Sequence, residues 1–311
     1  MAFHGLLLID KPTGLTSHDV VAKVRRIMGT KSVGHSGTLD PLASGLMVLL
    51  IGEATKLSQY ILEQNKAYKV KAKLGLTTDT LDITGQALKT EVVKVSLVQI
   101  RNAAMSLSGE MQLPIPLFSA AKVDGKKLYE YARQGQEIEP PLKVMNFFDL
   151  EFHSQGPDWV EMSMHCTKGS FIRSWVHLLG QKLGCGAAMS ELRRTESQPY
   201  KLDQALTFEE LENQMRDLPR DQQPQGRGFV PMLATLPQAK LIRVKGQDRV
   251  MISNGLISHD LRTLLIGSFQ PGRDDVIKIL AQETGELLAL IGIEPKKGFV
   301  FRRVFRYEES T

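Results

Sequence analysis

The chain has 311 residues, of which 42% are hydrophobic and 23% are charged. This length allows a sizeable core and more than one folding unit, and the composition excludes a disordered or fibrous protein. No stretch approaches the roughly 20 apolar residues of a membrane-spanning helix, and the apolar run that ends at Asp10 is too short for a signal peptide. We therefore expect a cytoplasmic protein with no part in the membrane.

Cysteine content and charge narrow the class of protein further. Cys166 and Cys185 are the only cysteines and lack the CxxC spacing, so we expect two buried, reduced thiols rather than a disulfide framework or a cysteine-rich zinc site. The net charge of +5 favours a polyanionic partner such as nucleic acid. An excess of this size is also common in proteins that bind no nucleic acid.

The N-terminal elements begin with a short buried strand at residues 5–10 and a turn at residues 11–14. Ser17 then stands where a helix N-cap belongs, before apolar residues at helical spacing and basic residues on the other faces. A glycine-punctuated polar loop at residues 34–45 leads into the apolar run 46–51. A loop anchored on a buried strand is a good place for chemistry, because the scaffold holds its side chains still.

The middle of the chain predicts a mixture of helices and strands. In order these are a helix near 53–64, a strand at 68–74 with its lysines on one face, a loop at 77–85, a helix at 96–107, an extended segment at 114–118, a short helix at 126–133, paired strands at 142–153 and 158–166, and helices near 173–183 and 208–215. This irregular mixture indicates an α+β fold with flanking helices around a mixed, mainly antiparallel sheet.

The C-terminal part is set off by residues 218–228, which are rich in Pro, Gly and Gln. Beyond them, short apolar runs broken by glycines predict a small β-rich module. We expect a large domain at residues 1–217, a linker at 218–235 and a second domain at 236–311.

Asp40 follows residues 37–39 of the polar loop and precedes Pro41. The proline lacks an N–H group and holds Asp40 extended. Asp is a good N-cap and Pro a good first helical residue, so the residues alone favour a cap on a short helix over a catalytic carboxylate.

Other chemistry-bearing patterns in the N-terminal region lack the required spacing. His35 has no second metal ligand nearby and predicts an ordinary loop histidine. Residues 17–19 and 35–36 are too close in sequence for a hydrolase triad, whose members converge from separate segments. Gly34 and Gly37 lack the ending of a phosphate-binding loop, and the chain has no GxGxxG motif. No metal or nucleotide cofactor is indicated.

Two long motifs carry a family resemblance, GLLLIDKPTGLTSHDVV at residues 5–21 and GHSGTLDPLASG at residues 34–45. Both closely resemble the N-terminal motifs of the bacterial tRNA pseudouridine-55 synthases, the TruB family. Shorter matches continue the resemblance through about the first two hundred residues, namely KAYKV at 66–70, TDTLD at 78–82, QLPIPLFSA at 112–120, GKKLYEYAR at 125–133, CTKGSFIR at 166–173 and LRR at 192–194. The C-terminal module resembles a PUA domain, a small RNA-binding β-barrel.

The resemblance implies a pseudouridine synthase-like fold and an isomerase that turns a tRNA uridine into pseudouridine. It implies that Asp40 is the nucleophile, that Tyr68 stacks on the target base and assists proton removal, and that Arg173 pairs with Asp40. An aspartate of ordinary pKa, about 3.9, is already ionised at neutral pH, and a neighbouring arginine would keep it so.

The resemblance also implies how substrate is held. Leu192 would wall the pocket, with Lys11 and Phe171 beside the substrate. His35 would insert into the T-loop and take the space vacated when the uridine swings out. The implied enzyme uses no cofactor or metal and acts as a monomer on the tRNA T-arm, without a guide RNA or protein partner.

Departures from the family pattern keep two alternatives open. Phe118 and Phe171 stand where the family more usually has tyrosine, so any hydrogen bond from those hydroxyls is lost. Ser36 replaces the commoner threonine and is also similar to archaeal and eukaryotic relatives that act with a guide RNA. A guide-dependent synthase is therefore one alternative, and an RNA chaperone that remodels tRNA without chemistry is another.

Overall fold

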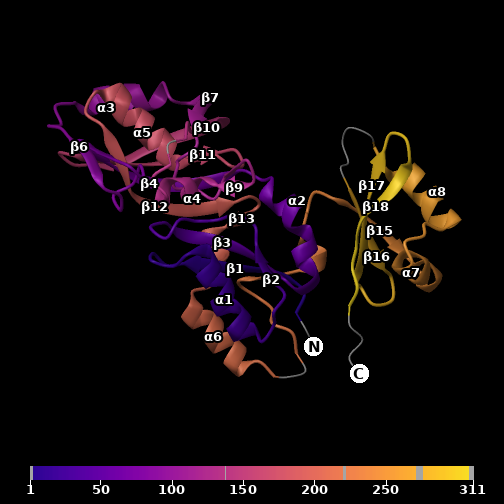
Figure 1. Ribbon diagram of the computed structural model, residues 1–311. Coiled ribbons are helices and arrows are strands. Elements are labelled where there is room, and N and C mark those ends of the chain that lie inside the picture. The colour runs from indigo at the N-terminus through magenta and orange to yellow at the C-terminus, as the bar shows by residue number, and fades with distance from the viewer. Residues whose placement is uncertain (1–2, 137, 220–221, 271–275, 308–311) are drawn as a thin grey trace.

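The computed structural model describes residues 3–136, 138–219, 222–270 and 276–307. This part of the chain confirms the α+β prediction. It contains a ten-stranded, mainly antiparallel sheet with helices packed on it, and a four-stranded sheet near the C-terminus (Figure 1).

The first half of the large sheet is built on β1 (Gly5–Lys11) and β3 (Ser44–Ile51), which pair antiparallel along their lengths. Two short strands extend this half, β2 (Val33–His35) beside β3 and β14 (Phe229–Pro231) beside β1. Residues 45–51 of β3 are all buried. A strand with both faces covered reads as a continuous apolar run, which explains the sequence at this point.

Different elements cover the two faces of this half. On one face α1 (Ser17–Met28) and α6 (Phe208–Asp217) pack against the strands. On the other face lie a 3-10 helix, η1 (Gly52–Leu57), and a five-residue α-helix, α2 (Ser58–Leu62). The helix expected near residues 53–64 is thus two short pieces.

The second half of the large sheet holds longer antiparallel strands. In spatial order they are β12 (Ala187–Ser197), β4 (Lys66–Leu74), β11 (Trp159–Cys166), β10 (Leu142–Gln155) and β7 (Gly109–Pro114). Two helices, α3 (Leu97–Met105) and α5 (Ile172–Leu183), pack on this half around the buried Trp175. Its indole Nε1 donates a hydrogen bond to the carbonyl oxygen of Leu107 at 3.0 Å, so the largest core side chain is also satisfied.

The two halves join where β12 runs parallel to β3, through Arg193 opposite Ser44 and Arg194 opposite Gly45. Gly45 has a φ of +100°, and a Cβ there would lie 2.3 Å from the carbonyl oxygen of Arg194. Only glycine allows this approach. The sequence did not predict β12, because residues 187–197 show neither a sustained apolar run nor strict alternation.

Short elements complete the first 239 residues. They are β5 (Leu76–Thr78), β6 (Ala87–Thr90), β8 (Lys122–Val123), β9 (Lys126–Lys127), α4 (Leu128–Arg133), β13 (Tyr200–Lys201), η2 (Leu202–Gln204) and η3 (Met232–Ala234). The extended segment predicted at residues 114–118 lies mostly past the end of β7, which stops at Pro114.

The C-terminal unit is an open sheet with two helices. Its strands lie in the order β15 (Lys240–Val244), β16 (Ile277–Ala281), β17 (Leu287–Glu294) and β18 (Gly298–Val304), and its helices are α7 (Gly246–Ser253) and α8 (His259–Ser268). Across the described residues β15 and β18 do not pair to close a barrel. The β-rich module is present, and its assignment as a PUA domain stays a prediction.

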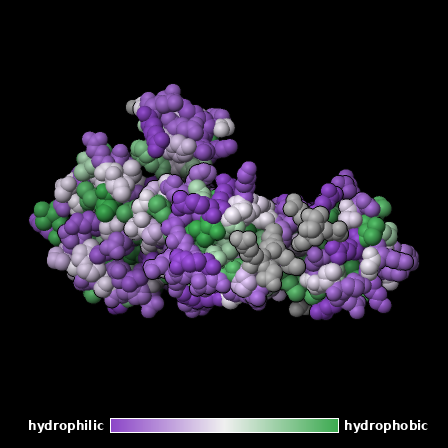
Figure 2. All heavy atoms as spheres, turned by 90° about the horizontal axis from the view of Figure 1, so that it is seen from below, coloured by the Kyte–Doolittle hydropathy of each residue, from purple (hydrophilic) through white to green (hydrophobic). Residues whose placement is uncertain are grey.

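The segment predicted as a linker, residues 218–235, includes β14 in the large sheet. The chain therefore returns to the first unit after residue 228 before it enters the second, and the domain boundaries stay a prediction. Cys166 and Cys185 are both free and buried, as expected. Hydrophilic side chains cover most of the face seen in Figure 2, with hydrophobic ones in small scattered groups. Within the described ranges, no helix has the length and apolarity to cross a membrane.

Candidate active site

A cavity of about 370 Å³ lies where the two halves of the large sheet meet. Six of the seven residues that the sequence singled out line it, namely His35, Asp40, Tyr68, Phe171, Arg173 and Leu192. They come from the loop before β3, from strands β2, β4 and β12, and from the start of α5. Segments far apart in the sequence thus converge on one concave site, as expected for a binding pocket.

The loop that carries Asp40 is tied to α1. The Ser17 hydroxyl accepts a hydrogen bond from the Leu39 N–H at 2.8 Å and lies 3.0 Å from the Leu39 carbonyl oxygen. The prediction that Ser17 is the helix N-cap was wrong by one residue: Thr16 is the N-cap, in a reciprocal capping box with Asp19. Ser17 is therefore free to hold the loop instead.

The helix-capping alternative for Asp40 is wrong. Residues 40–43 form a turn in which the Ala43 N–H donates to the Asp40 carbonyl oxygen at 3.0 Å, and β3 starts at Ser44. No helix begins at Pro41. The Asp40 carboxylate therefore does not cap a helix, and it lines the cavity.

Arg173, in the first turn of α5, pairs with Asp40 through a 3.0 Å contact between Nε and Oδ2. Its other nitrogens are also engaged: Nη1 donates to the Thr80 carbonyl oxygen at 3.0 Å and Nη2 to the Phe118 carbonyl oxygen at 3.1 Å. Asp82 Oδ2 lies 3.9 Å from Nη1. A buried guanidinium with every edge engaged holds a fixed orientation, and so fixes the carboxylate.

The electrostatics of Asp40 differ from the expectation of an ordinary aspartate. Burial raises the pKa of its carboxyl above the usual value, and Arg173 opposes this shift without cancelling it. The side chain is 40% exposed, on the cavity side. The carboxylate is thus poorly hydrated yet reachable, two properties that favour nucleophilic attack.

Tyr68 lies on β4 beneath the cavity, and burial raises the pKa of its hydroxyl, so the phenol is neutral at physiological pH. Arg194, directly opposite on β12, interacts with this hydroxyl. Its Nε donates to the Leu46 carbonyl oxygen at 2.6 Å, and its Nη atoms lie 3.4 and 3.5 Å from the carbonyl oxygens of Thr38 and Gly37. Arg194 therefore links Tyr68 to the loop of Asp40.

Arg194 was not among the predicted site residues, although it ends the LRR motif at residues 192–194. The family motif was the available signal, but a buried arginine that holds backbone carbonyls has no pattern of its own. Leu62 and Lys66 also line the cavity and were not among the predicted site residues. Burial lowers the pKa of Lys66 to about 8.

The cavity walls are apolar where Phe171 and Leu192 meet. Phe171 immediately precedes α5, and its backbone N–H points at Met145 Sδ, 3.3 Å away. His35 lies at the rim on β2, and burial followed by the charge of Arg194 lowers its pKa, so the ring is neutral. Its buried Nδ1 makes no hydrogen bond to any described residue.

Lys11 is the one predicted site residue that does not line the cavity. Its side chain is 0% exposed, and Nζ donates to the carbonyl oxygens of Ala43 at 2.6 Å and Pro12 at 3.0 Å. Burial lowers its pKa to about 8. Lys11 thus supports the turn after Asp40, and its direct contact with substrate stays a prediction.

The chemistry open to this cavity follows from the groups that line it. Asp40 is the only carboxylate among the described lining residues. Cys166 also lines the cavity, but burial raises its pKa to about 12, so it remains a thiol and a weak nucleophile. Across the described residues no group of three or more His, Cys, Asp or Glu side chains is placed to hold a metal ion. The arrangement suits attack by one carboxylate on an electrophile held against apolar walls.

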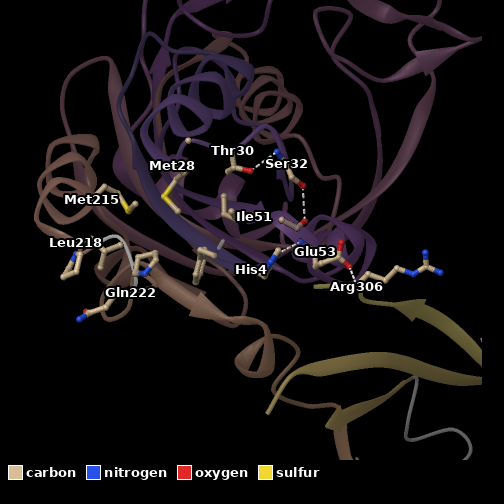
Figure 3. Close-up of a pocket in the computed structure, with 15 residues that line it drawn as sticks. His4, Met28, Thr30, Ser32, Ile51, Glu53, Met215, Leu218, Gln222 and Arg306 are labelled. Atoms are coloured by element: carbon tan, nitrogen blue, oxygen red, sulfur yellow. Dashed lines mark hydrogen bonds between the residues drawn. The ribbon is translucent and has the colours of Figure 1, made fainter. Parts of the chain in front are cut away.

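A second cavity, of about 540 Å³, lies on another side of the first unit (Figure 3). Met28, Ile51 and Met215 form its apolar part, and His4 and Glu53 lie at its edge near Arg306. None of the predicted site residues lines it. Size alone therefore does not make it the candidate active site.

Comparison with known sequences gives two family matches. Residues 25–172 match the TruB family pseudouridylate synthase N-terminal domain, and residues 173–232 match the tRNA pseudouridylate synthase B C-terminal domain. The tRNA pseudouridine synthase B of Bdellovibrio bacteriovorus is 56% identical over 306 residues, which cover 98% of each chain. That of Aeromonas salmonicida is 43% identical over 247 residues, 77% of each chain.

Solved structures share the fold. A chain of a Cbf5–Nop10–Gar1 complex has a TM-score of 0.68 at 24% identity, with 97% of this chain and 84% of that chain covered. An H/ACA RNP bound to a substrate RNA containing 2′-deoxyuridine gives 0.68 at 22% identity, with 98% and 86% covered. The sequence matches decide the family where the structural ones give only the fold: this chain belongs to the TruB family of pseudouridylate synthases.

Proposed function

We propose that this chain is a stand-alone isomerase that converts the T-loop uridine at position 55 of tRNA into pseudouridine, with Asp40 as the nucleophile. The observation that carries the proposal is the Asp40 carboxylate, paired with Arg173 Nε at 3.0 Å and facing a cavity of about 370 Å³. Support for tRNA as substrate comes from the relatives named tRNA pseudouridine synthase B, one of them matched over 98% of both chains.

The reaction needs one nucleophile and no redox step. The bond between uracil N1 and ribose C1′ breaks, the ring turns, and a bond between C5 and C1′ forms while C5 loses its hydrogen as a proton and N1 gains one. A carboxylate can attack, hold a fragment and leave again, which divides one difficult substitution into two easier steps. In this scheme Asp40 attacks either C1′ of the ribose or C6 of the base.

The target base must leave the RNA stack to reach Asp40. Enzymes that act on a base take it out of the stack, and RNA loops with splayed bases make this less costly. We assign base stacking and assistance in proton removal to Tyr68, the apolar walls to Phe171 and Leu192, and the orientation of the carboxylate to Arg173. His35, neutral and at the rim, enters the T-loop where the uridine has left.

The C-terminal unit is proposed as an RNA-binding module of the PUA type. The catalytic domain spans residues 1–217 with β14 added to its sheet, and residues 236–311 form the second domain. Such a module adds contacts to the phosphate backbone, which raise affinity and make it dependent on salt.

Tritium release from tRNA labelled at uridine C5 tests the activity, because the new bond at C5 expels that hydrogen into water. The purified chain and bare tRNA should suffice, and the enzyme should act as a monomer in the cytoplasm. A requirement for a guide RNA or a protein partner would favour the guide-dependent alternative. Remodelling of tRNA without tritium release would favour the chaperone.

A further inference from the structure

The helical part of the connection between β3 and β4, residues 52–62, lies between the two units of the molecule. Ala54, Leu57 and Ile61 are buried in a cluster that also contains Leu287 and Phe305 of the C-terminal part. The segment consists of η1 and the five-residue α2, and neither has a side-chain N-cap. Helices this short are not stable alone, so packing and hydrogen bonds from its surroundings hold it in place.

One end of this segment reaches the catalytic cavity. Leu62, the last residue of α2, is 40% exposed and lines the cavity, and its Cδ2 lies 3.8 Å from the point where a Cβ of Gly37 would stand. Leu62 therefore packs beside the loop that carries Asp40. The Lys66 ammonium donates to the Leu62 carbonyl oxygen at 2.7 Å, which ties the end of α2 to the start of β4.

The C-terminal unit contacts the segment at Lys56 and Gln59 through Arg303. Its Nε donates to the Lys56 carbonyl oxygen and its Nη2 to Gln59 Oε1, both at 2.9 Å. In the other direction, Lys56 Nζ donates a hydrogen bond to the Val304 carbonyl oxygen at 3.2 Å. A planar guanidinium that engages one residue of η1 and one residue of α2 fixes the place of both short helices.

A further bond reinforces this contact at the start of η1. The backbone N–H of Arg306 donates to Glu53 Oε2 at 2.7 Å, and the Glu53 N–H donates to His4 Nδ1 at 3.1 Å (Figure 3). The His4 ring in turn packs edge to face on Tyr307, with ring centroids 5.2 Å apart. The segment is therefore held at Lys56 and Gln59 by the end of β18, and at Glu53 by Arg306 just after that strand.

We propose that Arg303 is a positioning residue for the catalytic cavity: through Lys56 and Gln59 it sets the place of α2, and thereby of Leu62 beside the Asp40 loop. This inference rests on the proposed function of the cavity. The C-terminal unit then acts on the reaction of bound tRNA as well as on affinity. Its loss slows the step that follows binding.

The test uses the full-length protein with Arg303→Ala, Arg303→Lys and, as a matched control, Arg302→Ala. Arg302 neighbours Arg303 in β18 but bonds within its own unit, to Glu294 Oε1 at 2.9 Å and the Ile293 carbonyl oxygen at 3.0 Å. Single-turnover tritium release at saturating enzyme measures the reaction of bound tRNA, and a separate titration measures the Kd.

Arg303→Ala should slow single turnover by about five- to tenfold while the Kd changes by about twofold or less, a loss of the size expected for two hydrogen bonds. Arg303→Lys, which keeps the positive charge but has a single donor nitrogen, should recover part of the rate, and Arg302→Ala should remain near wild type. Gln59→Ala added to Arg303→Ala should cost little more, because both act through one contact. Amide hydrogen exchange in residues 58–62 should be faster in Arg303→Ala than in wild type, and unchanged in Arg302→Ala.

An unchanged single-turnover rate, or a loss confined to the Kd, would overturn the inference and make Arg303 an RNA contact or a bystander. Equal slowing by Arg302→Ala would do the same, since it would point to general damage to β18. Asp40→Asn runs in parallel: if that variant keeps full activity, the cavity is not the active site and the proposed function fails first. Loss of activity in Asp40→Asn with no effect of Arg303→Ala removes only the positioning role.

Discussion

Arg173 Nε lies 3.0 Å from Asp40 Oδ2, although Arg173 is in the first turn of α5 and Asp40 lies in the loop before β3. The pair joins the two halves of the large sheet across the cavity. Burial raises the pKa of the carboxyl, and Arg173 is the leading influence in the opposite direction. Burial and Arg173 therefore shift the pKa of the Asp40 carboxyl in opposite directions, and each effect can be changed separately.

Replacement of Asp40, the proposed nucleophile, gives the first prediction. Asp40→Asn should abolish tritium release while tRNA binding stays within about tenfold, because an amide keeps the shape but is a poor nucleophile. The exposed Asp19→Asn in the α1 cap controls for loss of a carboxylate. Multiple turnover by Asp40→Asn in the tritium assay would remove Asp40 from its role.

The acid limb of the pH profile gives the second prediction. Since only the carboxylate form attacks, activity should fall as pH drops through the Asp40 pKa, which lies above the ordinary 3.8. Arg173→Met removes the largest influence that lowers this pKa, so the acid limb of the profile should move to higher pH. The maximal rate should also fall. Single-turnover rates between pH 5 and 8, roughly, with tRNA folding checked at each pH, measure this. A limb that moves to lower pH would contradict the assigned charge relationship.

Lys11 gives the third prediction, which concerns stability. Lys11→Met should cost about 1–3 kcal/mol of unfolding free energy, because the Ala43 and Pro12 carbonyl oxygens lose a buried donor. The native pKa is lowered from 10.5 to about 8, so the unfolded chain binds more protons in that interval. Wild-type stability relative to Lys11→Met should therefore rise with pH between those values. Urea unfolding, with the less buried Lys23→Met as control, measures both effects, and a falling difference would contradict the sign.

Removal of divalent ions gives the fourth prediction. Activity should persist in excess EDTA, because the proposed substitution uses the Asp40 carboxylate and needs no Lewis acid. The tRNA should first be shown to stay folded under the same conditions. Activity that disappears with EDTA and returns on addition of one divalent ion would argue for a metal-dependent step.

The predictable part of the fold followed from local patterns. The apolar run at residues 46–51 predicted β3, and the helices expected at residues 96–107 and near 208–215 correspond to α3 and α6. Strand β12 escaped prediction because its pairing with β4 is long-range, and its residues carry no local strand pattern. Ser17 was misplaced because two adjacent hydroxyl residues can each cap a helix, and only the contact with Leu39 decides between them.

The candidate site was predictable from motif resemblance but not from single residues. Taken alone, Asp40 favoured helix capping, and the turn at residues 40–43 shows no such helix. Lys11 belongs to one of the matching motifs but does not line the cavity, because sequence does not reveal whether a side chain points into a cavity or under it. Arg194 was missed because its partners are backbone carbonyls from two other segments.

Phe171 stands where the family more usually has tyrosine. It lies two residues before Arg173, the partner of Asp40, and lines the cavity. Its ring packs partly against the core of the second half of the sheet, and Lys143 Nζ lies 6.0 Å from the ring centroid. The ring supplies an apolar face that excludes water, while Arg173 is already held by the carbonyl oxygens of Thr80 and Phe118. A hydroxyl at this position is therefore not required to orient the arginine.

The wild-type enzyme should accordingly be active, and Phe171→Tyr should be nearly neutral, because the added hydroxyl can reach the open side of the cavity. Phe171→Ala should lose substantial activity. Its destabilisation should stay below the roughly 3–5 kcal/mol of a fully buried phenylalanine, since the ring is only half-buried. Single-turnover tritium release by both variants, each measured the same number of degrees below its own melting temperature, separates the effect on activity from the effect on stability. A folded Phe171→Ala enzyme that reacts as fast as wild type would show that the ring takes no part in the site, whatever its place in the cavity wall.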